Sequence, residues 1–151
     1  MKKIRKSFLI YIVLCSSLGV LQETYASKAD ARNAQQVERG KLVYKKFCSL
    51  CHGANLEGQP NWRVRDKEGK LPAPPHDSSG HTWHHADELL FGMTKYGLVP
   101  PYAPKDYKNN MPAWEGTLSD EDIWAVIAYI KSKWPEELRQ AQEETNRGSF
   151  Q

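Results

Sequence analysis

The chain has 151 residues, with 21 Lys or Arg against 18 Asp or Glu, and a formal net charge of +3 at pH 7. This length suits one compact domain behind a short targeting segment and is too short for two domains of ordinary size. The whole charge excess comes from four basic residues and one acid near the start of the chain, namely Lys2, Lys3, Arg5, Lys6 and Glu23. The remainder is close to neutral and does not predict nucleic-acid binding.

Residues 1–26 have the pattern of a secretory signal peptide. The basic residues precede an apolar run from Phe8 to Leu21, and small residues near Ala26 occupy the positions that a signal peptidase reads. We expect cleavage after Ala26 and a periplasmic location. An uncleaved membrane anchor is the alternative, although the apolar run is short of the roughly 20 residues that a span needs. Lipidation of Cys15 is not expected, because Leu14 stands where a small residue belongs.

The predicted domain covers residues 34–134, after a flexible lead-in at 27–33. Apolar residues at spacings of three and four predict a first helix over 34–47. Gly40 lies inside this helix, where glycine costs about 1 kcal/mol relative to alanine. A glycine at that position indicates close approach by another backbone.

The first helix runs into the strongest motif of the chain, Cys48-Ser49-Leu50-Cys51-His52. Two thiols three positions apart, followed at once by an imidazole, form the pattern that attaches haem c. Each thiol can bind one vinyl group as a thioether, and the imidazole can bind the iron. A zinc site, a redox thiol pair and a simple disulfide are the alternatives, but zinc usually needs four ligands and a redox pair needs a βαβ context.

Residues 63–85 form a long predicted loop with an unusual content of histidine. Four imidazoles and a carboxylate lie close together in the sequence, at His76, Asp77, His81, His84 and His85. Such a group can bind copper or zinc. The alternative is a solvated loop that leads into a helix over 86–96.

The second long helix is predicted to begin after Ser119, which acts as N-cap with Asp122 three residues later. Ile123, Val126, Ile127 and Ile130 share one face of this helix, and the face is expected to pack against the first helix where Gly40 lies. Pro135 ends the helix after Trp134. The polar tail at 135–151 lacks an apolar face wide enough for firm docking.

Together these features resemble a class I c-type cytochrome over residues 34–134. The resemblance rests on Gly40, Tyr44, the motif at 48–52, the late Met111-Pro112 and the helix segment 128–131. It implies an all-α fold in which the first and last helices cross and loops wrap one covalently bound haem c. Cys48, Cys51 and His52 are then the attachment residues.

A methionine thioether is the expected sixth ligand, because a His/Met pair raises the reduction potential of haem iron. Met111 lies in a polar, non-helical stretch that resembles the Met-Pro ligand loop of the family. Met93, on a helix and therefore more typical of core filling, and a histidine are the alternatives. The resemblance also offers Pro60 as the carbonyl that orients His52. Trp62 or Trp83 is a candidate donor to a haem propionate, unless it is only a packed aromatic.

The function implied is a monomeric, monohaem electron carrier and not an enzyme. It would pass single electrons from a membrane-bound donor to an oxidase or reductase, touching the membrane only in transient docking. A basic rim of Lys41, Lys45 and Lys46 could steer an acidic partner. The alternatives are a peroxidase-like haem enzyme and a haem or copper sensor that uses the histidine-rich loop.

Overall fold

The computed structural model describes residues 28–149, and the expected signal peptide, its cleavage site and Cys15 lie outside this part of the chain. Within it, secondary structure is helical and no strand is present, which confirms the predicted all-α fold. The five α-helices are α1 (Ala34–Val43), α2 (Ser49–His52), α3 (Asp87–Tyr96), α4 (Asp120–Ser132) and α5 (Glu136–Gly148). A π-helical turn, Tyr44–Cys48, joins α1 to α2, and a 3-10 turn, Thr82–His84, precedes α3. No helix in residues 28–149 is long and apolar enough to cross a membrane.

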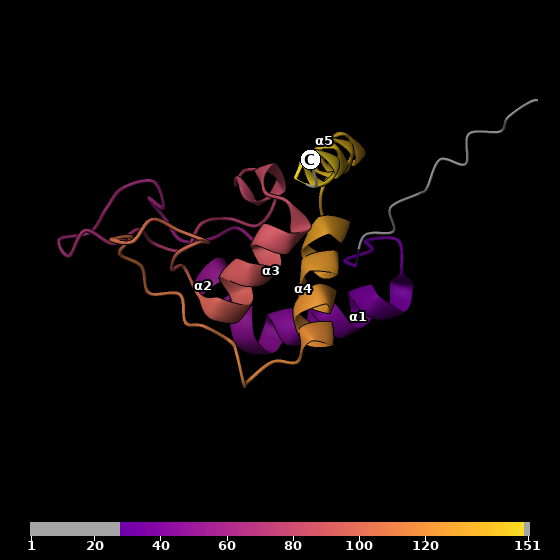
Figure 1. Ribbon diagram of the computed structural model, residues 1–151, viewed down its shortest axis with the longest axis horizontal. Coiled ribbons are helices and arrows are strands. Elements are labelled where there is room, and N and C mark those ends of the chain that lie inside the picture. The colour runs from indigo at the N-terminus through magenta and orange to yellow at the C-terminus, as the bar shows by residue number, and fades with distance from the viewer. Residues whose placement is uncertain (1–27, 150–151) are drawn as a thin grey trace, which may run out of the picture.

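Helices α1 and α4 cross, and theirs is the most extensive contact between helices in residues 28–149 (Figure 1). The apolar face predicted for α4 is buried, with Ile123, Val126, Ile127 and Ile130 all at most 7% exposed. A Cβ added at Gly40 would lie 1.9 Å from the carbonyl oxygen of Ala125, so the absence of a side chain lets the two backbones touch. The predicted role of Gly40 is confirmed.

Polar contacts at the start of α4 fix the helix against α1. The Ser119 hydroxyl accepts a hydrogen bond from the backbone N–H of Asp122 at 3.1 Å, as the capping pattern predicted. Arg39 of α1 donates to the Asp122 carboxylate at 2.8 Å. The guanidinium of Arg39 is the main reason that the pKa of Asp122 is lowered. The cap and the ion pair therefore involve the same residue, Asp122, the cap through its backbone N–H and the ion pair through its carboxylate.

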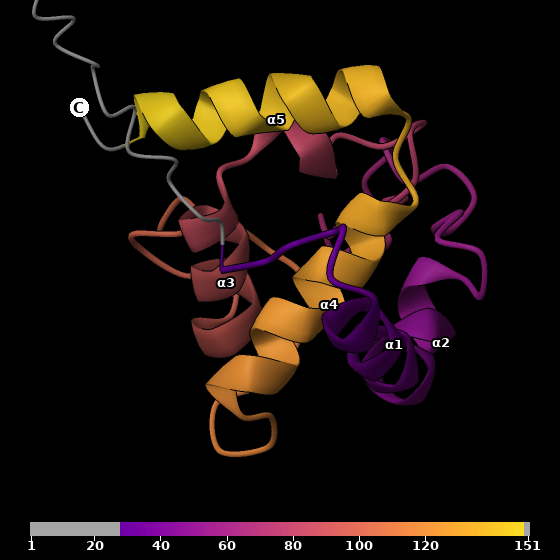
Figure 2. The ribbon, with the colours of Figure 1, turned by 90° about the vertical axis from the view of Figure 1, so that its right-hand side faces the viewer.

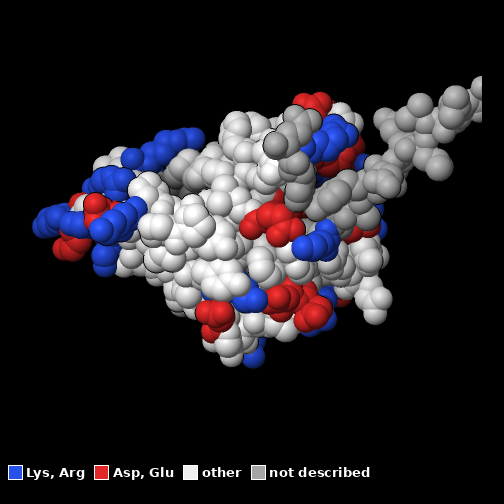
Figure 3. Space-filling view, in the orientation of Figure 1, with Lys and Arg blue, Asp and Glu red and all other residues white. Residues whose placement is uncertain are grey.

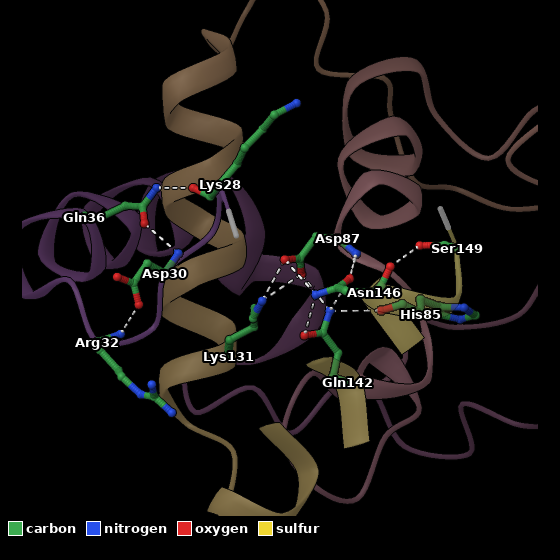
Figure 4. A network of polar contacts seen from close by, with 10 residues as sticks. All are labelled: Lys28, Asp30, Arg32, Gln36, His85, Asp87, Lys131, Gln142, Asn146 and Ser149. Carbon is green, nitrogen blue, oxygen red and sulfur yellow. Dashed lines mark hydrogen bonds and ion pairs between the residues drawn. The ribbon is translucent and has the colours of Figure 1, made fainter. Parts of the chain in front are cut away.

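The C-terminal segment docks firmly, so the expectation of a loosely held polar tail at 136–147 was wrong. Helix α5 lies across the ends of α3 and α4 (Figure 2). Its contact is polar: the buried amide of Gln142 donates to Asp87 at 2.6 Å, and the amide of Asn146 donates to the same carboxylate at 3.1 Å. Lys131 of α4 donates to both oxygens of Asp87 at 2.8 Å (Figure 4). A search for an apolar stripe misses such a network, because its members are polar by type.

The described part of the expected flexible lead-in is also held in place. Ala29 is buried, and the Gln36 side chain donates to the carbonyl of Lys28 at 2.7 Å and accepts from the N–H of Asp30 at 2.8 Å (Figure 4). The Asn33 side chain caps α1 through the N–H of Gln36. Residues 28–33 therefore continue the domain.

We expect Gly40→Ala to lower the free energy of unfolding by about 3 kcal/mol or more, because the new methyl overlaps a backbone carbonyl that cannot rotate away. Gly148→Ala is the matched control, since nothing lies within 4 Å of a Cβ there. Its stability should be unchanged or slightly higher. Denaturant unfolding of both variants tests this, and equal stability of the two would contradict the close crossing.

Candidate functional site

The first helix continues without interruption into the Cys-x-x-Cys-His motif. The wider turn at Tyr44–Cys48 adds one residue to the helical path before α2 begins. Cys48 and Cys51 are three positions apart and therefore share one face of the helix. Both are free thiols, Cys48 partly buried and Cys51 exposed. The two sulfurs can thus receive one planar group from the same side.

His52 is buried at the end of α2, and its ring is held by a backbone carbonyl. Its Nδ1 lies 2.9 Å from the carbonyl oxygen of Pro74, which leaves Nε2 for a metal. Burial lowers the pKa of the His52 imidazole, and the contact with Pro74 offsets part of that effect. The neutral ring that results is the form that binds iron.

The carbonyl that orients His52 was predicted at Pro60, and that prediction was wrong. The chain after His52 turns back on itself, so that the N–H of Gln59 donates to the carbonyl of Ala73 at 2.9 Å. A Cβ on Gly58 would lie 2.4 Å from the nitrogen of Pro75. This close pairing of two distant segments brings Pro74, 22 residues after the histidine, to the place where a nearer proline was expected.

Tyr44 stabilises the turn that follows His52. Its side chain is 1% exposed, and its hydroxyl lies 2.9 Å from the carbonyl oxygen of Gly53 and 3.2 Å from that of His52. Burial raises the pKa of the Tyr44 hydroxyl well above its usual value, so it remains a donor. The aromatic residue in the first helix therefore fixes the end of the motif.

His76 stacks directly on His52, a contact that sequence reasoning missed. The two ring centroids are 4.0 Å apart and the ring planes differ by 23°. The Nδ1 of His76 lies 2.8 Å from the Thr82 hydroxyl, and Trp134 donates to the carbonyl of His76 at 2.7 Å. Burial keeps the pKa of His76 well below its usual value. Trp134, just after α4, is thus connected to the motif through His76.

The remaining histidines of the loop do not gather around a common point. His81 stacks on Trp62 with centroids 5.4 Å apart, whereas His84 stacks on Trp83 at 3.6 Å. Among residues 28–149, no group of three or more His, Cys, Asp or Glu side chains is placed to hold a metal ion. His81 also packs edge-on against His85, with centroids 5.4 Å apart, but the predicted copper or zinc cluster is not formed among these residues.

The same observations bear on the other interpretations of the cysteine pair. Burial raises the pKa of the Cys48 thiol to about 12, whereas a redox pair attacks as the thiolate. The βαβ context of a redox pair is missing from the described residues, which contain no strand. A thioredoxin-like pair therefore does not fit, and residues 28–149 contain no group of three or more ligands of the kind that a zinc knuckle needs.

The two candidate methionines lie where the sequence predicted. Met93 is on α3, and Met111 is in the non-helical segment between α3 and α4. The N–H of Met111 donates to the Asn109 side chain at 2.9 Å. Three residues later, Trp114 packs edge-on against Phe47 at 5.3 Å, next to Cys48. Both methionines are partly buried, and the choice between them stays a prediction.

Trp83 offers a direct test of whether the site fits a haem. Its Nε1 is buried and is the one buried side-chain nitrogen or oxygen in residues 28–149 without a hydrogen-bond partner. A buried donor that makes no hydrogen bond costs about 1–3 kcal/mol of stability. An acceptor such as a haem propionate would satisfy it. The site therefore provides two thiols on one helix face, an oriented imidazole and a free buried donor, and these residues fit a covalently bound haem.

Comparison with known proteins gives a family match over most of the domain. Residues 35–130 match the family model described as cytochrome c oxidase, cbb3-type, subunit III. Cytochrome c6 from Tetradesmus obliquus is 28% identical over 92 residues, which make up 60% of this chain and 83% of that protein. No solved structure gives a significant match.

We expect Gly58→Ala to destabilise the site, because its Cβ would collide with the backbone that carries the Pro74 carbonyl. Gly116→Ala is the matched control: it has a similar positive φ, 76° against 70°, but nothing within 4 Å. The difference between the two variants in free energy of unfolding should be about 1–3 kcal/mol, with Gly58→Ala the less stable. Equal losses would attribute the whole effect to backbone strain and contradict the close pairing.

Proposed function

The chain belongs to the c-type cytochromes, in the family described as cytochrome c oxidase, cbb3-type, subunit III, and we propose that it is an exported monohaem electron carrier. The family implies a covalently bound haem c and redox partner proteins. The observation that carries the proposal is the oriented, buried His52 directly after two thiols on one helix face. Haem iron supplies a one-electron couple when bound in such a site.

In this proposal each residue of the motif has one task. Cys48 and Cys51 tether the macrocycle through thioethers, so that the cofactor does not exchange. His52 binds the iron through Nε2, while Pro74 holds Nδ1 and thereby fixes the orientation of the ring. The buried stack with His76 limits rotation of His52 further. A ligand that cannot move reduces the reorganisation that accompanies each change of oxidation state.

We propose Met111 as the sixth ligand. Its segment returns to the motif helix through the contact between Trp114 and Phe47. The hydrogen bond from its N–H to Asn109 fixes the backbone just before a proline. A thioether in this position would close the iron to substrates, which supports electron transfer and not bond-making catalysis. Trp83 is the proposed donor to a propionate.

The peroxidase-like alternative requires an open or displaceable sixth position, and a sensor requires a site for its signal. The copper sensor has lost its support, because the described histidines form no metal-binding group. We therefore retain the carrier as the proposed function. Cleavage after Ala26, the periplasmic location, the monomeric state and the identity of donor and acceptor are parts of the proposal.

The ligand assignment is tested by the charge-transfer band that a sulfur ligand gives to ferric haem. We expect the band in the wild type and in Met93→Ala, and its complete loss in Met111→Ala, because only the latter removes the proposed ligand. Absorption spectra of the natively matured proteins measure it. Retention of the band in Met111→Ala would refute the assignment, and ready cyanide binding by the wild type would favour an enzyme.

A further inference from the structure

Positive charge gathers at the end of the molecule that the long loops form (Figure 3). Two loops contribute, one at residues 63–70 and the other at 105–110. Four cations from them define what we call the basic loop surface: Arg65, Lys67, Lys70 and Lys108. Arg65, Lys67 and Lys108 are exposed and Lys70 is partly so.

The first loop has a fixed conformation. The carboxylate of Asp66 accepts hydrogen bonds from the backbone N–H groups of Glu68 at 3.0 Å and Lys70 at 2.7 Å. The N–H of Gly69 donates to the carbonyl of Asp66 at 3.0 Å, and Arg65 donates to the carbonyl of Gly69 at 2.6 Å. The cations are therefore presented by a closed, hydrogen-bonded turn.

The second loop is joined to the first by three contacts. Lys70 donates to the Asn110 side chain at 2.7 Å. The guanidinium of Arg65 lies 5.8 Å from the ring centroid of Tyr107, and the side chain of Lys108 lies against Gly69. Cations that are about 40 residues apart in the sequence thus form one surface.

The charge of this surface is available to a partner. None of its four cations forms an ion pair in the part of the chain that the structure describes. By contrast, Arg39 of α1 is paired with Asp122 and Lys95 of α3 with Asp120. Of the two acids in the first loop, Asp66 is engaged by the turn itself. Unpaired, exposed cations of this kind steer the approach of oppositely charged molecules.

The surface also lies beside the proposed sixth ligand. Asn110, which receives the hydrogen bond from Lys70, directly precedes Met111, and Asn109 holds the N–H of Met111. A partner seated on the loops would therefore stand next to the ligand segment. In the basic rim expected at Lys41, Lys45 and Lys46, Lys41 is paired with Glu38 at 3.6 Å, whereas Lys45 and Lys46 form no ion pair within residues 28–149.

We propose that the basic loop surface is the docking surface for an acidic redox protein. The inference rests on the proposed function and adds the face through which electrons pass. A protein partner fits better than an anionic membrane, because acids are interleaved with the cations and Val64 is the one large apolar side chain exposed in loop 63–70. Lipid binding draws on apolar and aromatic side chains beside the cations.

The test uses a reversal of three charges against a matched reversal elsewhere. The test variant is Arg65→Glu, Lys67→Glu, Lys108→Glu in the holoprotein. The control is Lys45→Glu, Lys46→Glu, Lys133→Glu, which changes the net charge equally at exposed positions in the turn Tyr44–Cys48 and just after α4. The probe is hexacyanoferrate(II), which loses one electron to become hexacyanoferrate(III) while ferric haem gains it and becomes ferrous.

At low ionic strength we expect the test variant to react with this anion about tenfold more slowly than the control, and the difference to vanish in 1 M salt. Hexaammineruthenium(II), a cationic donor of one electron, should reduce the test variant at least as fast as the wild type, which shows that the variant is intact. Equal slowing of the two variants, or greater slowing of the control, would overturn the proposal.

Two further experiments distinguish an acidic protein from an anionic membrane as the binding partner. Poly-L-glutamate should inhibit the hexacyanoferrate reaction of the wild type but not of the test variant. Phosphatidylglycerol vesicles should not bind the wild type, and vesicle binding that the test variant loses would overturn the choice of a protein partner. Failure of the wild type to accept an electron from either reagent would instead refute the proposed function.

Discussion

The hydrogen bond between His52 Nδ1 and the carbonyl oxygen of Pro74 joins the helical motif to the loop that closes over it. It fixes the ring of the histidine, and burial keeps that ring neutral. The bond depends in turn on Gly58, where any side chain would push the two backbone segments apart. His76 then stacks on the fixed ring and is itself tied to Trp134, so the end of α4 contributes to the same support.

Two kinds of packing hold the rest of the domain around this site. At Gly40 the helices α1 and α4 touch through backbone atoms, and the apolar face of α4 fills the core. At the other end, α5 docks through a buried network centred on Asp87 and Lys131. Removing two charges from water is costly, so this network is weak as a source of stability, but its hydrogen bonds define one orientation for α5.

Regular patterns in the sequence predicted the helices and their crossing. The spacing of the isoleucines and the cap at Ser119 depend on residues close together in the sequence. Gly40 depends on the contact between two neighbouring helices. Sequence reasoning failed where distant segments of the chain meet. The carbonyl that contacts His52 belongs to Pro74, and His76 stacks on His52 instead of lying with the other loop histidines. It also underestimated α5, because the buried residues of this helix are the polar Gln142 and Asn146, and Leu138 is its one apolar contact with the core. The fold and the motif were thus predictable from the sequence, whereas the residues that surround His52 were not.

The central claim, that a haem is covalently bound through Cys48 and Cys51, is tested most directly by mass spectrometry of natively matured protein after acid-acetone extraction. The account predicts that the pigment stays with the protein and that the proteolytic peptide carrying both cysteines has gained the mass of one haem. Release of the pigment into the solvent, or the unmodified mass of that peptide, would contradict the account.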